Sequence, residues 1–414
     1  MGQNHNPRRK IINDPVYGFI TITGDLIFEL IEHPYFQRLR RIKQLGMSHM
    51  VYPGAHHTRF NHALGAMHLM SLAISSLREK GADITPEEAE GALVAILLHD
   101  IGHGPFSHSL EFSIVRGVDH EAISRLLMEK LNSEFDGRLD TGIAIFQNRY
   151  PKKFLHRLVS SQLDMDRLDY LMRDSFYTGV SEGVIGNQRI IKMLNVADDR
   201  LVIEEKGIYS IEKFIVARRL MYWQVYLHKT VVSAERLLIG VLQRAKELAL
   251  GGDKLFASPA LAEFLYRDVT HADFTDKDCP LLHTYCSLDD FDVMGAIKVW
   301  TEHPDPVLSD LCRRLVDRKL MRVVLGKEPF SESRIDEAKQ RAVDYLNKNG
   351  IDMRHLPYYF RVDELVNSAY DNESDQIEIL TKSGELLDLA AASDNQSLLA
   401  QTQSVRKYVL YGPK

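Results

Sequence analysis

Residues 97–108 read Leu97-Leu98-His99-Asp100-Ile101-Gly102-His103-Gly104-Pro105-Phe106-Ser107-His108. The stretch joins the end of an apolar helix to a turn rich in glycine and proline, and it holds three histidines and an aspartate. Neighbouring side chains on a regular helix point about 100° apart, so two of them converge on one ion most easily where a helix ends. Gly102 and Pro105 supply that ending. The adjacent imidazole and carboxylate of His99 and Asp100 suit a divalent transition metal.

The helix that runs into this stretch has a recognisable start. Thr85-Pro86-Glu87-Glu88 is a capping box with proline at the first helical position. Apolar residues then recur at helical spacing as far as Leu97. We therefore predict one helix from the capping box to His99–Asp100.

Two further predicted helices carry polar side chains that can meet this corner. Residues 57–80 have an apolar stripe at helical spacing, and Arg59 and His62, three residues apart, share a face. Residues 163–174 predict a second helix. One face of that helix carries polar side chains four residues apart, namely Asp166, Tyr170 and Asp174.

The remaining patterns predict a mainly α protein. Residues 10–24 favour a small β hairpin, and residues 210–250 favour a long helical block. Candidate strands are residues 200–205, 376–380 and 405–410. We predict a helical-bundle core with a short N-terminal β arm over residues 1–255, followed over residues 256–414 by a region that is first helical and then α+β.

Size and composition limit the classes of function. The chain has 414 residues, of which 45% are hydrophobic, and a net charge of -6, so it buries a large core and is poorly suited to coating nucleic acid. Three cysteines without close spacing favour a reducing compartment over a disulfide framework. The first residues lack the apolar core of a signal peptide, and no run approaches the ~20 apolar residues of a membrane span. We expect a cytoplasmic protein without a membrane partner.

Four side chains from three predicted helices form the strongest candidate site, namely His62, His99, Asp100 and Asp166. Nitrogen and oxygen ligands without thiolates suit one divalent ion of Mn, Fe, Zn, Ni or Co, and Mg less well. Two positions of an octahedron would stay open for water or a phosphate oxygen, as a hydrolytic metal requires. Taken alone, His62 is better explained as a hydrogen-bonded core histidine. The adjacent His99 and Asp100, with their flanking sequence, favour the metal site.

A second group of residues could act on a phosphate ester. A histidine can protonate a leaving oxygen near neutral pH or bind phosphate, and the candidates are His103, His108 and His120. The planar guanidinium of arginine matches phosphate oxygens, and the candidate anion binders are Arg59, Arg167, Tyr170 and Arg218. Lys229 is better explained as a solvated helix residue, and the aromatic residues at 222, 223 and 226 as core.

Four motifs together resemble a known family. They are the Arg-Phe-Asn-His of residues 59–62, the stretch 99–108, the Asp-His-Glu of residues 119–121 and the segment 164–170. They resemble the HD-domain metal-dependent phosphohydrolases, and more narrowly the branch of deoxynucleoside triphosphate (dNTP) triphosphohydrolases that includes the sterile-alpha-motif/HD proteins. The resemblance runs from about residue 10 to about residue 229. It implies an HD helical bundle, one bound divalent metal ion and a homo-oligomer.

The resemblance also implies roles for single residues. The metal ligands would be His62, His99, Asp100 and Asp166. Proton transfer at the cleaved phosphate would involve His108 and His120, while His103 would touch phosphate or the metal-bound water. The triphosphate would be held by Arg59, Arg167, Tyr170 and Arg218, and the deoxyribose would face Gln44, Leu45 and Asp174. An activator nucleotide would meet Lys10, Ile11, Asn13, Gln37 and Arg40, with Glu32 in place of an aspartate.

Together, these expectations predict a metal-dependent hydrolase that releases tripolyphosphate from a dNTP. A metal-activated water would attack the α-phosphorus. Two alternatives stay open. The first keeps the chemistry and changes the substrate, as in a nucleotide monophosphatase or a phosphodiesterase. The second is a nucleotide-sensing or single-strand nucleic-acid-binding protein, which salt-dependent binding to single strands would reveal.

Overall fold

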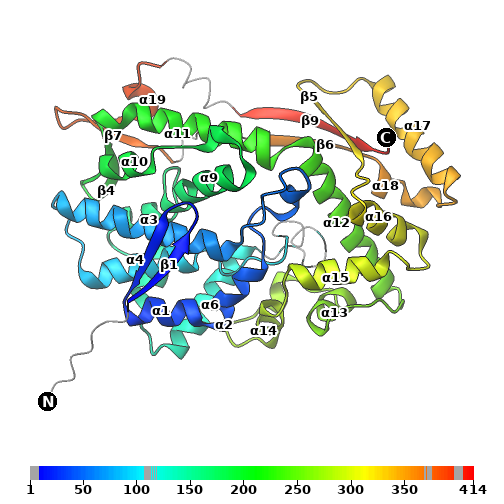
Figure 1. The fold of residues 1–414 in the computed structure, drawn as a ribbon, viewed down its shortest axis with the longest axis horizontal. Coiled ribbons are helices and arrows are strands. Elements are labelled where there is room, and N and C mark those ends of the chain that lie inside the picture. The colour runs from blue at the N-terminus through cyan, green and yellow to red at the C-terminus, as the bar shows by residue number, and fades with distance from the viewer. Residues whose placement is uncertain are drawn as a thin grey trace.

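Three helices that lie together in the left half of Figure 1 carry the predicted site. The computed structural model describes residues 9–106, 113, 115, 117, 119–367, 370, 375–395 and 404–414. Helix α3 (Arg59–Glu79) packs against both α4 (Pro86–Leu98) and α9 (Met165–Thr178). Helix α4 begins at the predicted capping box, where the Thr85 side chain accepts a hydrogen bond from the Glu88 amide. The helical bundle is therefore present where the sequence predicts it.

Further helices surround these three. They are α1 (Asp25–Glu32), α2 (Pro34–Gln37), α6 (His120–Glu134), α7 (Asp140–Phe146), α8 (Lys153–Val159) and α10 (Asn187–Met193). Helix α7 packs against α4, and α10 packs against α3. The buried side chains form one hydrophobic core that reaches from Ile20 near the N-terminus to Tyr411 near the C-terminus.

The block predicted over residues 210–250 contains a break that the sequence did not show. Helix α11 (Ile208–Met221) is followed by one π-helical turn (Tyr222–Tyr226), and α12 (Lys229–Leu250) starts afterwards. His228 caps α12 by accepting a hydrogen bond from the Thr230 amide. No glycine or proline marks the break, so the residue pattern continues through it. Single π turns are frequent at functional sites, and this one borders the cavity described below.

The N-terminal arm is the predicted hairpin. Strand β1 (Arg9–Asp14) pairs with the antiparallel β2 (Gly18–Thr23), with Asp14 opposite Gly18. In the turn, the Asp14 side chain accepts hydrogen bonds from the amides of Val16 and Tyr17. Strand β2 packs against α3, so the hairpin lies on the helical body.

Two small sheets use C-terminal residues. One has the order β3 (Leu194–Ala197), β4 (Arg200–Glu204), β7 (Glu378–Leu380) and β8 (Leu386–Asp388), and the β4–β7 pair is parallel. The other has the antiparallel order β5 (Arg322–Gly326), β9 (Val405–Gly412) and β6 (Arg361–Asn367). The strands predicted near residues 200, 378 and 405 are confirmed.

Helices complete the C-terminal region. They are α13 (Pro259–Tyr266), α14 (Pro280–Cys286), α15 (Asp290–Trp300), α16 (Pro306–Val316), α17 (Glu332–Lys348), α18 (Leu356–Tyr359) and α19 (Leu389–Ala392). Helices α17 and α18 lie at the same end of the molecule as the three-stranded sheet (Figure 1). The chain is mainly α with small sheets toward its C-terminus, as predicted. In the part of the chain that the structure describes, no helix has the length and hydrophobicity of a membrane span.

Candidate metal centre and substrate cavity

Three of the four predicted metal ligands meet at one point. His62 Nε2 lies 3.4 Å from His99 Nε2 and 3.1 Å from Asp166 Oδ1, and His99 Nε2 lies 3.6 Å from the same oxygen. They come from the first turn of α3, the end of α4 and the first turn of α9. Around one ion with bonds of about 2.1 Å, neighbouring ligand atoms lie about 3.0–3.4 Å apart. The three side chains therefore have the spacing and the chemistry of a site for one cation.

Hydrogen bonds to the opposite ring nitrogens orient both imidazoles. His62 Nδ1 lies 2.8 Å from Asp169 Oδ2, and His99 Nδ1 lies 2.7 Å from the Ile96 carbonyl oxygen. A ring nitrogen that donates to an acceptor leaves the other nitrogen free to bind a metal. Both Nε2 atoms consequently face the cluster, where each could bind a metal ion in place of a proton.

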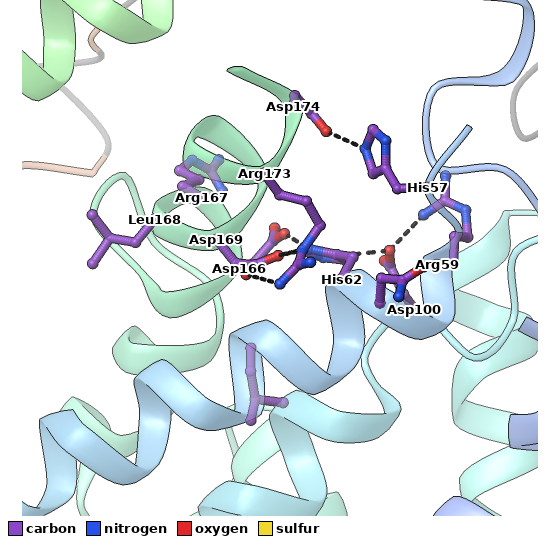
Figure 2. Close-up of polar contacts among 12 residues, drawn as sticks. His57, Arg59, His62, Asp100, Asp166, Arg167, Leu168, Asp169, Arg173 and Asp174 are labelled. Atoms are coloured by element: carbon purple, nitrogen blue, oxygen red, sulfur yellow. Dashed lines mark hydrogen bonds and ion pairs between the residues drawn. The ribbon is translucent and has the colours of Figure 1, made fainter. Parts of the chain in front are cut away.

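A line of buried charges supports Asp169 from behind (Figure 2). Arg173 donates to both oxygens of Asp169, at 2.9 and 3.0 Å, and reaches Asp14 of the hairpin at 2.7 Å. Helix α3 crosses this ion pair at Gly65, where a Cβ atom would lie 2.0 Å from Asp169 Oδ1. The absence of a side chain at residue 65 is what makes room for the pair.

Asp100, the fourth predicted ligand, lies beside the cluster. Its Oδ1 is 3.4 Å from His99 Nε2, and its Oδ2 is 3.8 Å from His62 Nε2. The same Oδ2 accepts a hydrogen bond from Arg59, which Figure 2 shows reaching toward Asp100. One oxygen of Asp100 thus faces the histidines, while the other is held by the guanidinium.

The charge states of these groups suit a cation. Burial opposes a charge on His62, but Asp166 and Asp169 outweigh it and raise the pKa of the ring to about 10. Burial also opposes ionisation of Asp166, yet its contacts with His62 and His99 hold its pKa below the usual range. Without a metal, a proton is shared between the buried rings and the ionised carboxylates. Metal binding would displace that proton, because the ion takes the same position. The residues present therefore fit a divalent ion.

One of the three candidate catalytic histidines lies beside Asp100, and a second stacks on the first. The rings of His103 and His120 stack with their centroids 3.8 Å apart, and His103 Nε2 lies 3.2 Å from Asp100 Oδ1. Burial and the charge of Arg59 lower the pKa of His103 to about 3. The third candidate, His108, lies outside the described residues.

A cavity of about 560 Å³ adjoins the cluster at Arg59. Its lining includes three predicted substrate residues, Gln44, Leu45 and Arg59, and also Phe106. Tyr222 and Tyr226 of the π turn form a wall of the cavity, although the sequence favoured a core role for them. The volume lies in the range of about 300–1,000 Å³ that small-molecule sites occupy.

The described lining of this cavity does not include the other predicted phosphate binders, although the ring of Tyr170 contacts the lining residue Tyr226 edge-on, with centroids 6.1 Å apart. Arg167 pairs with Asp164 at 2.9 Å, and Arg218 donates to the Gln162 side chain at 3.5 Å. Burial raises the pKa of Tyr170, and the nearby charges of Arg218 and Arg167 partly oppose that rise. These side chains therefore share one environment between α9 and α11.

Asp174, the predicted sugar contact, is buried behind the cavity wall. One of its oxygens lies 2.8 Å from His57 Nε2, and the other accepts a hydrogen bond from the Tyr226 hydroxyl at 2.7 Å (Figure 2 shows the His57 contact). In this arrangement Asp174 supports Tyr226, which is the residue that reaches the cavity.

Sequence reasoning missed the residues that support the site. Asp169 and Arg173 are four residues apart on α9, and an acid and a base at this spacing form an ion pair on a helix. This ion pair could therefore have been predicted from the sequence. Asp14 and His57 come from distant segments, and no local pattern connects them with α9.

Comparisons with known proteins identify the family to which this chain belongs. The model of the HD domain matches residues 59–173, and that of the HD associated region matches residues 185–258. A crystal structure of a phosphohydrolase from Bacteroides thetaiotaomicron has a TM-score of 0.94 and 54% identity, over 98% of this chain and 100% of that one. The chain belongs to the HD-domain phosphohydrolase family. HD domains are metal-dependent, and among the described residues of this phosphohydrolase the His62–His99–Asp166 cluster could hold the metal.

Two curated relatives bear on the branch of the family. The uncharacterized protein YwfO of Bacillus subtilis is 33% identical over 98% of this chain and 92% of its own length. A deoxynucleoside triphosphate triphosphohydrolase SAMHD1 homologue of Dictyostelium discoideum is 32% identical over 59% of this chain and 51% of its own length. The alignment with the dNTP triphosphohydrolase thus covers about half of that relative.

Proposed function

We propose that this phosphohydrolase converts a dNTP into a deoxynucleoside and tripolyphosphate, with one divalent ion bound by His62, His99, Asp100 and Asp166. The proposal rests on the position of Arg59 between the cavity and the candidate metal ligands. Arg59 lines the 560 Å³ cavity and also contacts Asp100. A nucleotide in that cavity would place its phosphates against the metal ligands. The similarity to dNTP triphosphohydrolases supports the same substrate class.

The chain's own side chains then have separate tasks. When bound, the metal would supply an activated water and polarise the phosphoryl group. Arg59, together with Arg167 and Arg218, neutralises the charge on the phosphate oxygens. Water adds to the α-phosphorus, the bond from that phosphorus to the 5′-oxygen breaks, and the 5′-oxygen takes a proton. His120, whose side chain is 22% exposed and stacked on His103, is our candidate donor of that proton, together with His108.

The sugar and regulatory contacts extend the proposal. Gln44 and Leu45 line the cavity and would form the wall against the deoxyribose. An activator nucleotide would bind near Lys10, which forms an ion pair with Glu32 at 2.8 Å, so that such a ligand would compete with this contact. We also propose a homo-oligomer.

Product analysis tests the reaction. Metal-loaded protein is incubated with each of the four dNTPs, and the products are separated by anion-exchange chromatography. We expect a deoxynucleoside and tripolyphosphate. Pyrophosphate or inorganic phosphate would mean that another bond is cut and would refute cleavage of the bond between the α-phosphorus and the 5′-oxygen. Hydrolysis of nucleoside monophosphates or cyclic dinucleotides instead of dNTPs would favour the alternative substrates.

A matched pair of variants ties the reaction to the cluster. Asp166→Asn keeps the side-chain shape and removes the charge that faces both histidine rings. Glu79→Gln makes the same chemical change at an exposed site on α3, where Glu79 pairs only with Lys192 among the described residues. We expect hydrolysis to be lost in the first variant and kept in the second. Equal activity in both would separate the reaction from the cluster.

A further inference from the structure

Two loops that border the cavity are joined by one carboxylate from the C-terminal region. Asp290, the first residue of α15, accepts a hydrogen bond from the Lys43 amide at 3.0 Å through Oδ2. Its Oδ1 accepts a hydrogen bond from the Phe106 amide at 3.1 Å. Phe106 lines the cavity, and Lys43 immediately precedes the lining residues Gln44 and Leu45. Asp290 lies outside both segments that the HD family models match.

The position of Asp290 is itself well defined. The preceding Asp289 caps α15 by accepting a hydrogen bond from the Phe291 amide at 2.9 Å, and its side chain also contacts Arg41. Further along α15, Val293 and Trp300 are buried in the core. Helix α15 is therefore fixed to the body of the protein and presents Asp290 in one place, with 5% of the residue exposed.

The loop residue on the other side of this contact has an uncommon backbone. Phe106 adopts φ of 52°, in the left-handed region that a bulky side chain rarely enters. Such a conformation persists only where surrounding contacts impose it. The hydrogen bond from the Phe106 amide to Asp290 is one such contact, and it holds the aromatic ring at the cavity.

We propose that Asp290 is a positioning residue for substrate binding, because it fixes the Lys43–Leu45 loop and Phe106 relative to each other at the border of the cavity. This inference rests on the proposed function. The metal-binding side chains His62 and Asp166 come from α3 and α9, which Asp290 does not touch among the described contacts. Loss of Asp290 should therefore weaken nucleotide binding and leave metal binding unchanged.

Asp290→Asn is the main test variant. Asparagine has the same shape but one acceptor oxygen instead of two, so one of the two loop amides loses its partner. Losing a hydrogen bond to a charged acceptor corresponds to about a tenfold or larger effect. We expect KM for a dNTP to rise about tenfold or more, kcat to stay within about twofold, and the affinity for Mn²⁺ to be unchanged.

Asp305→Asn is the matched control. Asp305 also stands at a helix start in the C-terminal region, where it accepts hydrogen bonds from the Leu308 amide at 2.8 Å and from Arg244. It contacts neither cavity loop in the described part of the chain. The control variant should lose comparable hydrogen bonding at its own helix start, without a change in KM for the dNTP. Asp290→Glu, which keeps both oxygens but moves them by one methylene, should fall between wild type and Asp290→Asn.

Hydrogen exchange measured by mass spectrometry tests the same contact without any activity. The amides of Lys43 and Phe106 should exchange faster in Asp290→Asn than in wild type or Asp305→Asn. Unchanged exchange and unchanged KM would overturn the inference, as would a loss of kcat and Mn²⁺ affinity with KM unaltered. If wild-type protein hydrolyses no nucleotide, the proposed function fails, while the exchange measurement still decides the role of Asp290.

Discussion

Replacing Gly65 by alanine should disrupt the site from behind. The added Cβ would lie 2.0 Å from Asp169 Oδ1 and 2.1 Å from Arg173 Nη2, where ordinary contact begins at 3.4 Å. The carboxylate would have to retreat by about 1.4 Å. Such a shift cannot preserve the 2.8 Å hydrogen bond between Asp169 and His62.

The magnitude follows from the burial of this network. Asp169 and Arg173 have fully buried side chains, and breaking a buried ion pair costs about 3–5 kcal/mol. Alanine in a helix interior is more stable than glycine by about 1 kcal/mol, which offsets part of this cost. We therefore expect Gly65→Ala to lower the free energy of unfolding by about 2–4 kcal/mol. Because Asp169 orients the ring of His62, metal affinity should fall by about 10–100-fold.

Urea denaturation and a Co²⁺ titration followed by absorbance measure the two effects. Gly295→Ala is the control, because Gly295 lies within α15 and an added Cβ there meets no heavy atom within 4 Å in the described structure. That variant should be stabilised by up to about 1 kcal/mol. If Gly65→Ala proves as stable as Gly295→Ala and binds Co²⁺ as tightly as wild type, the assigned role of the Asp169–Arg173 pair is wrong.

Three further predictions concern single side chains. Asp166→Ala should weaken metal binding by at least about 100-fold, and metal analysis after dialysis would count against the site if the variant kept one ion per chain. Tyr226→Phe removes the hydroxyl that donates to buried Asp174 and should lower the free energy of unfolding by about 1–3 kcal/mol in urea, whereas an unchanged midpoint would mean that this bond contributes nothing. Burial lowers the pKa of His49 to about 4, so between pH 6.5 and 4 the unfolded chain binds a proton that the folded chain does not, and stability falls with falling pH. His49→Gln should lose less stability than wild type between pH 7 and pH 5, and equal losses would contradict this assignment.

The helices of the site could be predicted because their signals are local. A capping box starts α4, an apolar stripe marks α3, and the four-residue spacing on α9 places Asp166 on one face. The adjacent His99 and Asp100 at a helix end also marked the corner at which His62 and Asp166 were expected to converge. In the structure, the distances from His62 Nε2 to His99 Nε2 and to Asp166 Oδ1 are those of neighbouring ligand atoms around one ion.

The supporting contacts could not be predicted because they join segments far apart in the sequence. Asp14 reaches Arg173 across 159 positions, and Asp290 reaches Phe106 across 184. Such pairs leave no periodic pattern. The π turn after α11 was missed for a different reason, because its aromatic residues are compatible with an ordinary helix and only their place beside the cavity distinguishes them.

The parallel pairing of β4 with β7 has a practical consequence for anyone who shortens this protein. Val202 lies opposite Glu378, so a fragment that stops after residue 255 would leave the edge of β4 without its neighbour. Exposed strand edges recruit other chains and promote aggregation. A recombinant catalytic fragment would therefore need to retain the distal segment around residues 378–388.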